Sequence, residues 1–257
     1  MKKRAIYILQ TICISGYLLY EGYRYYSPPI FYKPYHTTKH SSDTIQIAFI
    51  GDSWALLHQK HNCLIPTLLE KEYHRPVDVH SLGLPRITSK EFYKAIYDNM
   101  EIKNLFLTKS FDYCIVVIGV NDTDNKMSTS YYTNSIEGII QFLLANHIKP
   151  IIIEIPDYDI HKSFKNQGKI KMALRYFSMF INNVPKDCKQ PFRDSLHRLI
   201  HKKEYDNNVI IINYKSWNPI FERDLETIYQ ADGLHLNNEG YDRLDRAIVK
   251  AIIKEKK

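Results

Sequence analysis

The chain has 257 residues, of which 44% are hydrophobic and 25% are charged, which is the balance of an ordinary globular protein with an ample core. Its formal net charge is +7, but the excess is local: residues 1–26 carry a surplus of three positive charges and residues 157–205 a surplus of six. Because the surplus of positive charge is concentrated in these segments and no nucleic-acid module is recognisable, the sequence argues against a nucleic-acid partner.

The N-terminal segment, residues 1–26, is predicted to be a membrane anchor. Lys2, Lys3 and Arg4 precede sixteen uncharged residues, 5–20, which is marginal for a span of about 20 apolar residues. No clear small-residue cleavage site follows, so an uncleaved anchor is favoured, with a cleaved signal peptide and a soluble helix as alternatives. The positive-inside rule then places the rest of the chain outside the cytoplasm. Proline-rich residues 27–43 are expected to be a linker to a domain over 44–257.

Five short runs rich in β-branched residues follow in the domain, at 44–50, 77–82, 113–119, 150–155 and 208–213. Several are nearly continuous in apolar residues, as in parallel strands that helices cover on both faces. Segments with helical spacing separate them, at 54–71, 89–108, 130–147, 161–205 and 238–254. This alternation predicts an α/β fold: a three-layer α/β/α sandwich around a doubly wound, five-stranded parallel sheet of flavodoxin-like type, with a helical insert between strands four and five.

Polar residues and glycines follow the predicted strands. Ser53 follows the first strand, Gly83 the second and Asn121 the third, so all three should meet at the carboxyl edge of the sheet. Before the last helix, Asp232 and His235 are three residues apart. That spacing lets a carboxylate accept a hydrogen bond from the imidazole Nδ1–H and leaves Nε2 free to take a proton from a serine.

Four short blocks of sequence carry a family resemblance. "GDSW" at 51–54, "SLG" at 81–83, "GVND" at 119–122 and "DGLH" at 232–235 occur in the order of the blocks of the SGNH (GDSL-type) hydrolases, and the chain resembles that superfamily over residues 44 to 254. The resemblance implies a catalytic triad and an oxyanion hole. Its triad would be Ser53 as nucleophile, His235 as general base and Asp232 as the residue that orients it. Its oxyanion hole would use the backbone N–H groups of Ser53 and Gly83 and the side-chain amide of Asn121.

The second block departs from the family pattern at two positions. Ser81 stands where the family usually has asparagine, and Arg86 stands where it has a second glycine. The glycine that supplies the N–H is retained as Gly83, so we expect an altered pocket wall and intact chemistry. Trp54 replaces the leucine that usually follows the nucleophile.

Several other polar residues are predicted to have structural roles. Asp194 and His197 repeat the Asp-x-x-His spacing within a helical stretch and are expected on a solvated helix face. The same prediction is made for His58 and His61, which follow the nucleophile. Glu154 and Asp157, after the fourth strand, are expected to be polar loop residues.

The sequence carries no metal-binding motif, so neither a metal nor another cofactor is expected. Four cysteines are too few for a disulfide framework in a chain of this length, and spacing leaves open whether Cys63 and Cys188 pair.

The predicted function is a serine-dependent ester hydrolase that removes O-acyl groups, above all O-acetyl groups, from a surface or extracellular carbohydrate. The same triad would serve a polysaccharide O-acetyltransferase, in which a sugar hydroxyl replaces water as the acceptor. An SGNH-like glycan-binding module without catalysis is the alternative from another class of protein. Among the family's activities hydrolysis is the commoner, so it is the favoured prediction.

Overall fold

The computed structural model describes residues 2–27, 29–37, 43–165, 168–202 and 204–255. These fall into two compact units, Met1–Ile30 and Phe31–Lys257. The first unit contains one helix, α1 (Lys2–Tyr26), along which many apolar side chains are exposed. Among the described residues, no helix has both the length and the apolar character required to cross a bilayer, so the transmembrane helix expected in residues 1–26 is not found.

The second unit is built on a five-stranded sheet in the order β2-β1-β3-β4-β5, in which every neighbouring pair is parallel. This order confirms the predicted doubly wound α/β fold. All five residues of β3 are buried, and so are most residues of β1, because helices cover both faces. The strands are β1 (Ile45–Gly51), β2 (Val77–Gly83), β3 (Tyr113–Val117), β4 (Lys149–Ile153) and β5 (Ile210–Ile212).

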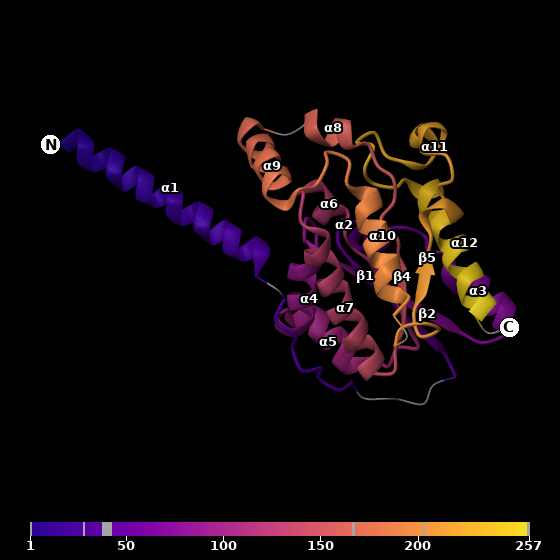
Figure 1. Ribbon diagram of the computed structural model, residues 1–257. Helices are drawn as coiled ribbons and strands as arrows, with labels where there is room; N and C mark the ends of the chain where they lie inside the picture. The colour runs from indigo at the N-terminus through magenta and orange to yellow at the C-terminus, as the bar shows by residue number, and fades with distance from the viewer. Residues whose placement is uncertain (1, 28, 38–42, 166–167, 203, 256–257) are drawn as a thin grey trace. The chain divides into compact units, whose positions relative to one another are not determined.

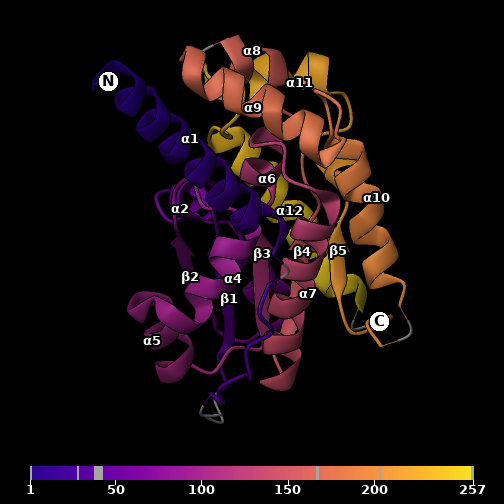
Figure 2. The ribbon, with the colours of Figure 1, turned by 60° about the vertical axis from the view of Figure 1, so that its left-hand side comes forward.

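The helices form two layers, with the sheet between them. Figure 1 shows α4, α7 and α10 on one side of the sheet and α3 and α12 on the other, and Figure 2 shows α8, α9 and α11 beyond the carboxyl ends of the strands. The helices of this unit are α2 (Ser53–His58), α3 (Ile65–Tyr73), α4 (Ser89–Asp98), α5 (Met100–Thr108), α6 (Val120–Asp124), α7 (Thr129–Ala145), α8 (Ile160–Lys165), α9 (Lys169–Asn182), α10 (Lys189–Ile200), the 3₁₀ turn η1 (Tyr214–Ser216), α11 (Phe221–Ile228) and α12 (Asn238–Glu255).

Two of the predicted helices are interrupted. The segment 54–71 divides into α2 and α3, and Pro66 lies in the first turn of α3, where its missing N–H costs no helical hydrogen bond. The segment 89–108 divides at Asn99, which ends α4 in an extended conformation and caps α5 by accepting from the N–H groups of Glu101 and Ile102.

The helical insert predicted between strands four and five is present, but only its first part is an elaboration. The segment 161–205 contains α8, α9 and α10, and α10 packs against α7 as the ordinary crossover helix. The extra structure is therefore α8 and α9.

Part of the predicted linker packs on the domain. The Tyr32 N–H donates to Tyr93 Oη (2.9 Å), and the Thr37 N–H donates to Asn146 Oδ1 (2.8 Å). Tyr35 contributes a hydrogen bond to the carbonyl of Ile96 and a ring contact with Phe142. Residues 38–42 of the same segment lie outside the described residues.

All four cysteines are free thiols, so the structure contains no disulfide between Cys63 and Cys188.

Candidate active site

Ser53 lies at the point where β1 ends and α2 begins. A Cβ on Gly51 would lie 1.9 Å from the carbonyl oxygen of Val117, so only glycine allows β1 to end against β3 here. Asp52 caps α2 by accepting from the Trp54 N–H at 3.0 Å. Because Asp52 supplies the cap, the hydroxyl of Ser53 is not used as the helix cap. As the first residue of α2, Ser53 also has a backbone N–H without an acceptor within the helix.

Asp232 and His235 lie in a closed loop before α12. An antiparallel bridge between Tyr229 and Leu236 closes this loop, and the Gln230 N–H donates to the His235 carbonyl at 2.7 Å. Gly233, in the middle of the loop, has φ +67°, a left-handed conformation that favours glycine.

The loop and the strand end together form one chain of hydrogen bonds. His235 Nε2 lies 2.9 Å from Ser53 Oγ, and His235 Nδ1 lies 2.6 Å from Asp232 Oδ2. The other oxygen of Asp232 accepts from the backbone N–H groups of Leu234 (2.9 Å) and His235 (3.0 Å). The sequence-predicted Ser53, His235 and Asp232 are therefore brought together in the order that proton transfer from a serine requires.

The carboxyl of Asp232 remains charged over the ordinary pH range. Burial raises its pKa, but the backbone hydrogen bond from His235, the imidazole and the Leu234 N–H outweigh burial, so the pKa lies below its usual value. A carboxylate in this state holds the proton on Nδ1 and leaves Nε2 as the acceptor.

Gly83 lies against the turn that carries Ser53. A Cβ at this position would lie 2.1 Å from the Leu56 nitrogen and 2.4 Å from the Asp52 oxygen, so the absence of a side chain lets β2 approach α2. Gly51 pairs with Gly83 and accepts from the Leu84 N–H, so the N–H of Gly83 is directed away from β1 at the edge of the sheet.

Asn121 lies in α6, directly after β3, and its amide is already engaged. Asn121 Nδ2 donates to Asp52 Oδ2 at 3.3 Å and to the Ile87 carbonyl at 3.0 Å. An amide has two N–H donors, so one of these contacts must be given up before the amide binds a developing oxyanion. The longer contact, to Asp52, is the weaker of the two.

Two buried carboxyls stand beside this site. Burial raises the pKa of Asp52 to about 7, against the hydrogen bond from Trp54 and with the charge of Asp122 adding to the rise. Burial likewise raises the pKa of Asp122 to about 7, against two hydrogen bonds from Ser89, whose Oγ lies 2.5 Å away. Asp122 thereby joins α6 to α4, which is a structural task.

A second chain of buried hydrogen bonds, which the sequence did not predict, lies behind α2. His58 was expected on a helix surface, and that prediction is wrong: the residue is 1% exposed. Its Nε2 lies 2.9 Å from Asp245 of α12, and its Nδ1 lies 3.0 Å from Ser81 of β2. His61 is also largely buried and stacks on Tyr241. Helical spacing alone could not reveal that His58 is buried, because its partners Ser81 and Asp245 lie 23 and 187 positions away in the sequence.

The remaining predicted positions have mixed outcomes. Asp194 is exposed, as expected, whereas His197 lies 2.8 Å from Glu154 and is only partly exposed. Glu154 is buried, while Asp157 bonds Arg193 at 2.7 Å in the loop after β4. Glu154 and Asp157 therefore both have structural partners, His197 and Arg193.

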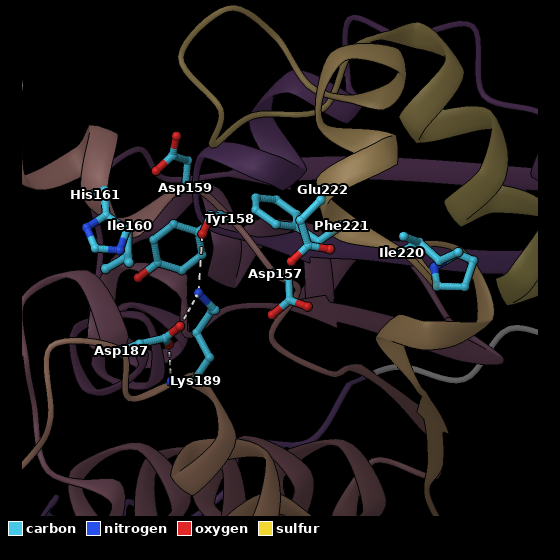
Figure 3. Close-up of a pocket in the computed structure, with 11 residues that line it drawn as sticks. Asp157, Tyr158, Asp159, Ile160, His161, Asp187, Lys189, Ile220, Phe221 and Glu222 are labelled. Carbon is cyan, nitrogen blue, oxygen red and sulfur yellow. Dashed lines mark hydrogen bonds and ion pairs between the residues drawn. The ribbon is translucent and has the colours of Figure 1, made fainter.

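A cavity of 460 Å³ lies beside the loop that carries Asp232. Figure 3 shows Asp157, Asp159 and Glu222 around it, with Asp187 bonded to Lys189 on its other wall. The N–H of Asp159 donates to the carbonyl of Gly233 at 2.9 Å, so one wall of the cavity supports the triad loop directly. The cavity thus offers charged and polar groups close to the loop that carries Asp232 and His235.

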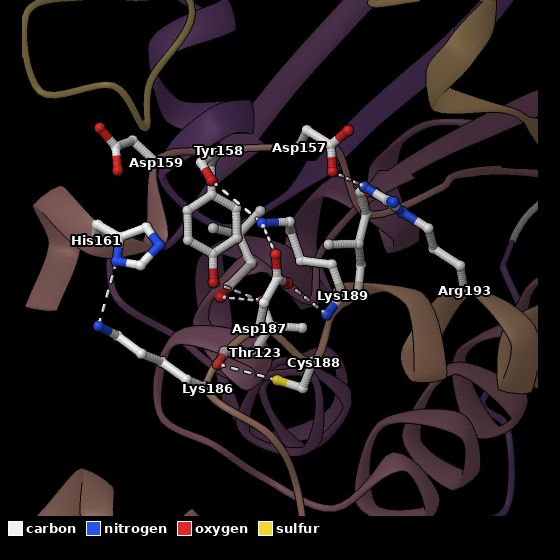
Figure 4. A network of polar contacts seen from close by, with 12 residues as sticks. Thr123, Asp157, Tyr158, Asp159, His161, Lys186, Asp187, Cys188, Lys189 and Arg193 are labelled. Carbon is white, nitrogen blue, oxygen red and sulfur yellow. Dashed lines mark hydrogen bonds and ion pairs between the residues drawn. The ribbon is translucent and has the colours of Figure 1, made fainter. Parts of the chain in front are cut away.

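A polar network anchors that wall to the rest of the site. In Figure 4, Tyr158 Oη lies 3.0 Å from Thr123 Oγ1 in α6, and Lys189 Nζ donates to the Tyr158 carbonyl at 3.2 Å. Lys162 of α8 donates to the carbonyl of Ala231, next to Asp232. The insert therefore holds the triad loop from one side.

Arg86, the departure from the family pattern near Gly83, is exposed and has a left-handed φ of +64°. Burial, and then the charge of Arg86, lowers the pKa of Lys171 in α9. The insert therefore brings a second cation, Lys171, close to Arg86.

Among the described residues, one group has metal-ligating atoms close together: His58, Cys63 and Asp245, within 4.8 Å of one another. Both ring nitrogens of His58 and both oxygens of Asp245 already have protein partners, the second oxygen accepting from the Leu64 N–H. His58 and Asp245 therefore belong to a structural hydrogen-bond network.

Comparison with known proteins identifies similar sequences and folds. The family model of GDSL-like lipases and acylhydrolases matches residues 69–248, a range that contains Gly83, Asn121, Asp232 and His235 and begins after Ser53. A search of curated proteins found no match.

Solved structures share the fold at low sequence identity. A GDSL-like lipase from Bacteroides thetaiotaomicron VPI-5482 has a TM-score of 0.54 and 18% identity, covering 81% of this chain and 88% of that one. The lipase/acylhydrolase from Enterococcus faecalis has a TM-score of 0.51 and 18% identity, with coverage of 81% and 95%. The acetyl xylan esterase AlAXEase has a TM-score of 0.52 and 17% identity, with coverage of 81% and 100%.

Proposed function

The chain belongs to the GDSL-like lipase/acylhydrolase family and is a serine esterase, and from that premise we propose that it removes O-acetyl groups from a carbohydrate through an acyl-enzyme on Ser53. The observation that carries the proposal is the continuous hydrogen-bonded chain from Ser53 Oγ through His235 to Asp232.

The geometry supports a two-step acyl transfer. Ser53 Oγ forms a bond to the ester carbonyl carbon while its proton moves to His235 Nε2, and Asp232 stabilises the imidazolium. The negative oxygen accepts from the N–H groups of Ser53 and Gly83, and from Asn121 once its amide turns away from Asp52.

The intermediate then collapses. The bond to the sugar oxygen breaks, and that oxygen takes the proton from His235 Nε2. Water attacks the acetyl carbon on Ser53 in the second step, and His235 Nε2 accepts its proton. The bond from that carbon to Ser53 Oγ then breaks, Oγ takes the proton back from His235, and acetic acid leaves as acetate.

Two observations favour a carbohydrate ester. The cavity beside the loop that carries Asp232 and His235 combines charged side chains, which can hydrogen-bond sugar hydroxyls, with large apolar ones: Asp157, Asp159, Glu222 and Lys189, and Ile160, Ile220 and Phe221. One of the solved structures that shares the fold is named an acetyl xylan esterase.

The experiment compares acetylated oligosaccharides with a long-chain p-nitrophenyl ester, using the wild type and Ser53→Ala. We expect acetate release from the sugar, preference for acetyl over long acyl groups, and a loss of at least about 10³-fold in the folded Ser53→Ala variant. Wild-type turnover in that variant would refute the mechanism. Acetylated acceptor sugar in excess of free acetate would indicate a transferase, and a folded protein that no fluorophosphonate labels would indicate a binding module.

We also propose that the enzyme acts outside the cytoplasm, because Lys2, Lys3 and Arg4 followed by the uncharged residues 5–20 have the pattern of an export signal. A reporter that works only outside the cytoplasm, fused after Lys257, should be active, and an inactive reporter would contradict this location.

A further inference from the structure

Helix α9 has an apolar face that points away from the domain. Its exposed large side chains are Ile170 (80%), Leu174 (39%), Tyr176 (52%), Phe177 (44%), Phe180 (84%) and Ile181 (37%). Ile170, Leu174, Phe177 and Ile181 follow the spacing i, i+4, i+7, i+11, so they form a single stripe along the helix, with Phe180 beside it. Soluble proteins rarely expose so many large apolar side chains together without a partner.

The opposite face of α9 fixes the helix to the domain. Arg175 is 2% exposed and forms an ion pair with Asp124 at the end of α6. Met172 and Met179 pack against the core, and Asn182 Nδ2 donates to the Lys126 carbonyl at 2.7 Å. The helix is therefore docked by one face, and the apolar stripe is a second, outward face.

The charge of α9 indicates what kind of partner fits this stripe. The exposed charged residues of the helix are Lys169 and Lys171, since Arg175 is turned inward, and the helix contains no acidic residue. A second copy of α9 would bring only cations to the interface. A partner with an apolar interior and a negatively charged surface would complement both the apolar stripe and the lysines of α9. An anionic lipid bilayer is such a partner.

We propose that α9 is an interfacial helix through which the domain binds the surface of an anionic lipid bilayer. Phe177, Phe180 and Ile170 enter the boundary between headgroups and acyl chains, while Lys169 at the start of the helix contacts the headgroups. The binding is independent of catalysis and needs no membrane-spanning segment.

Such binding would bring the active site to the membrane. The ion pair between Arg175 and Asp124 joins α9 to α6, the short helix that also carries Asn121. In a domain bound through α9, only α9 would therefore separate α6 from the lipid headgroups. The carboxyl edge of the sheet, where the ester is cleaved, would face the region in which a membrane-associated glycan presents its acyl groups.

The first test uses the full chain with Phe180→Trp as a reporter. The two native tryptophans, Trp54 and Trp217, are 0% and 3% exposed, so the added indole supplies the environment-sensitive signal. With vesicles of phosphatidylcholine containing about one third phosphatidylglycerol, we expect a shift of emission to shorter wavelength and quenching by brominated lipid. The matched control is Met100→Trp, on a 66% exposed position of α5, which should not respond.

The second test removes the apolar stripe. The double variant Ile170→Glu, Phe180→Glu should lower vesicle partitioning at least about tenfold, whereas Met100→Glu, Leu107→Glu should leave it unchanged. Hydrolysis of a soluble acetyl ester checks that each variant is folded, because none of these residues lies in the triad.

Three outcomes would overturn the proposal. Emission from Phe180→Trp that is unchanged in the presence of vesicles would exclude contact with lipid. Undiminished partitioning of the Ile170→Glu, Phe180→Glu variant would assign binding to another part of the chain. A spectral shift that grows with protein concentration without vesicles would identify a second copy as the partner.

Discussion

Replacing Asp232 with asparagine tests whether the triad works through the tautomer of His235. In the wild type, Oδ1 accepts two backbone N–H groups, from Leu234 and His235, while Oδ2 accepts from Nδ1 at 2.6 Å. The amide of Asp232→Asn can match only one of these patterns. If its oxygen keeps the backbone N–H groups, its NH₂ faces Nδ1, which must then become an acceptor, and the proton moves to Nε2, where it prevents proton uptake from Ser53.

The alternative orientation has a cost that the structure allows us to estimate. Turning the amide breaks two hydrogen bonds worth about 0.5–1.5 kcal/mol each, so the productive orientation is disfavoured by about 1–3 kcal/mol. Since about 1.4 kcal/mol is a factor of ten, and the negative charge that stabilises imidazolium is also lost, kcat/KM should fall by about 10²-fold or more.

The assay is hydrolysis of an acetyl ester, together with the rate of fluorophosphonate labelling of Ser53. Asp232→Ala is the matched control: the side chain is 44% exposed, so water can occupy the vacated space and does not impose the wrong tautomer. The alanine variant should therefore keep at least as much activity as the asparagine variant. If Asp232→Asn retains more than about a tenth of wild-type kcat/KM, the tautomer argument is refuted.

Three further predictions concern the supporting structure. Gly233→Ala places a side chain at φ +67°, so we expect strain of about 1–2 kcal/mol. Thermal unfolding should show the lower melting temperature, and kcat measured well below that temperature should also fall, because the strained loop carries His235. Asp122 has its pKa raised by burial to about 7, so its protonated form is favoured in the folded state and stability falls as pH rises from 3.8 to about 7; in Asp122→Asn, the difference in melting temperature between about pH 5 and about pH 8 should shrink. His58→Ala leaves the carboxylate of Asp245 buried beside an unpartnered Ser81 hydroxyl, so unfolding by urea should show a loss of about 3 kcal/mol or more, and a loss below about 1 kcal/mol would contradict that assignment.

The features that the sequence predicted correctly depend on short-range patterns. Continuous apolar runs indicate buried parallel strands, and their alternation with helical spacing predicts the doubly wound parallel sheet that the structure contains. Asp232 and His235 lie three residues apart in one loop, so their contact follows from local geometry. Ser53 meets them because the carboxyl ends of parallel strands share one edge.

The features that the sequence missed depend on distant partners or on direction. His58 pairs with Asp245, 187 positions away, and no spacing pattern in the sequence predicts that contact. The position of Asn121 was predictable, but the direction of its amide, toward Asp52 and Ile87, required coordinates. Likewise, the spacing in α9 indicates a helix with an apolar face, but only packing shows that Arg175 is turned inward and Phe180 outward.

The buried chain Asp245–His58–Ser81 gives a physical reason why serine can stand at a position where the family usually has asparagine. Ser81 lies in β2, two residues before Gly83, and its hydroxyl bonds the imidazole that Asp245 holds from α12. His58 is the last residue of α2, the helix that Ser53 begins. One imidazole therefore joins α2, which begins at Ser53, β2, which ends at Gly83, and α12, which follows His235. A hydroxyl is small enough to let that ring stack on Phe49 at 3.9 Å, so the serine and the histidine act as a matched pair that keeps the three parts of the site in register.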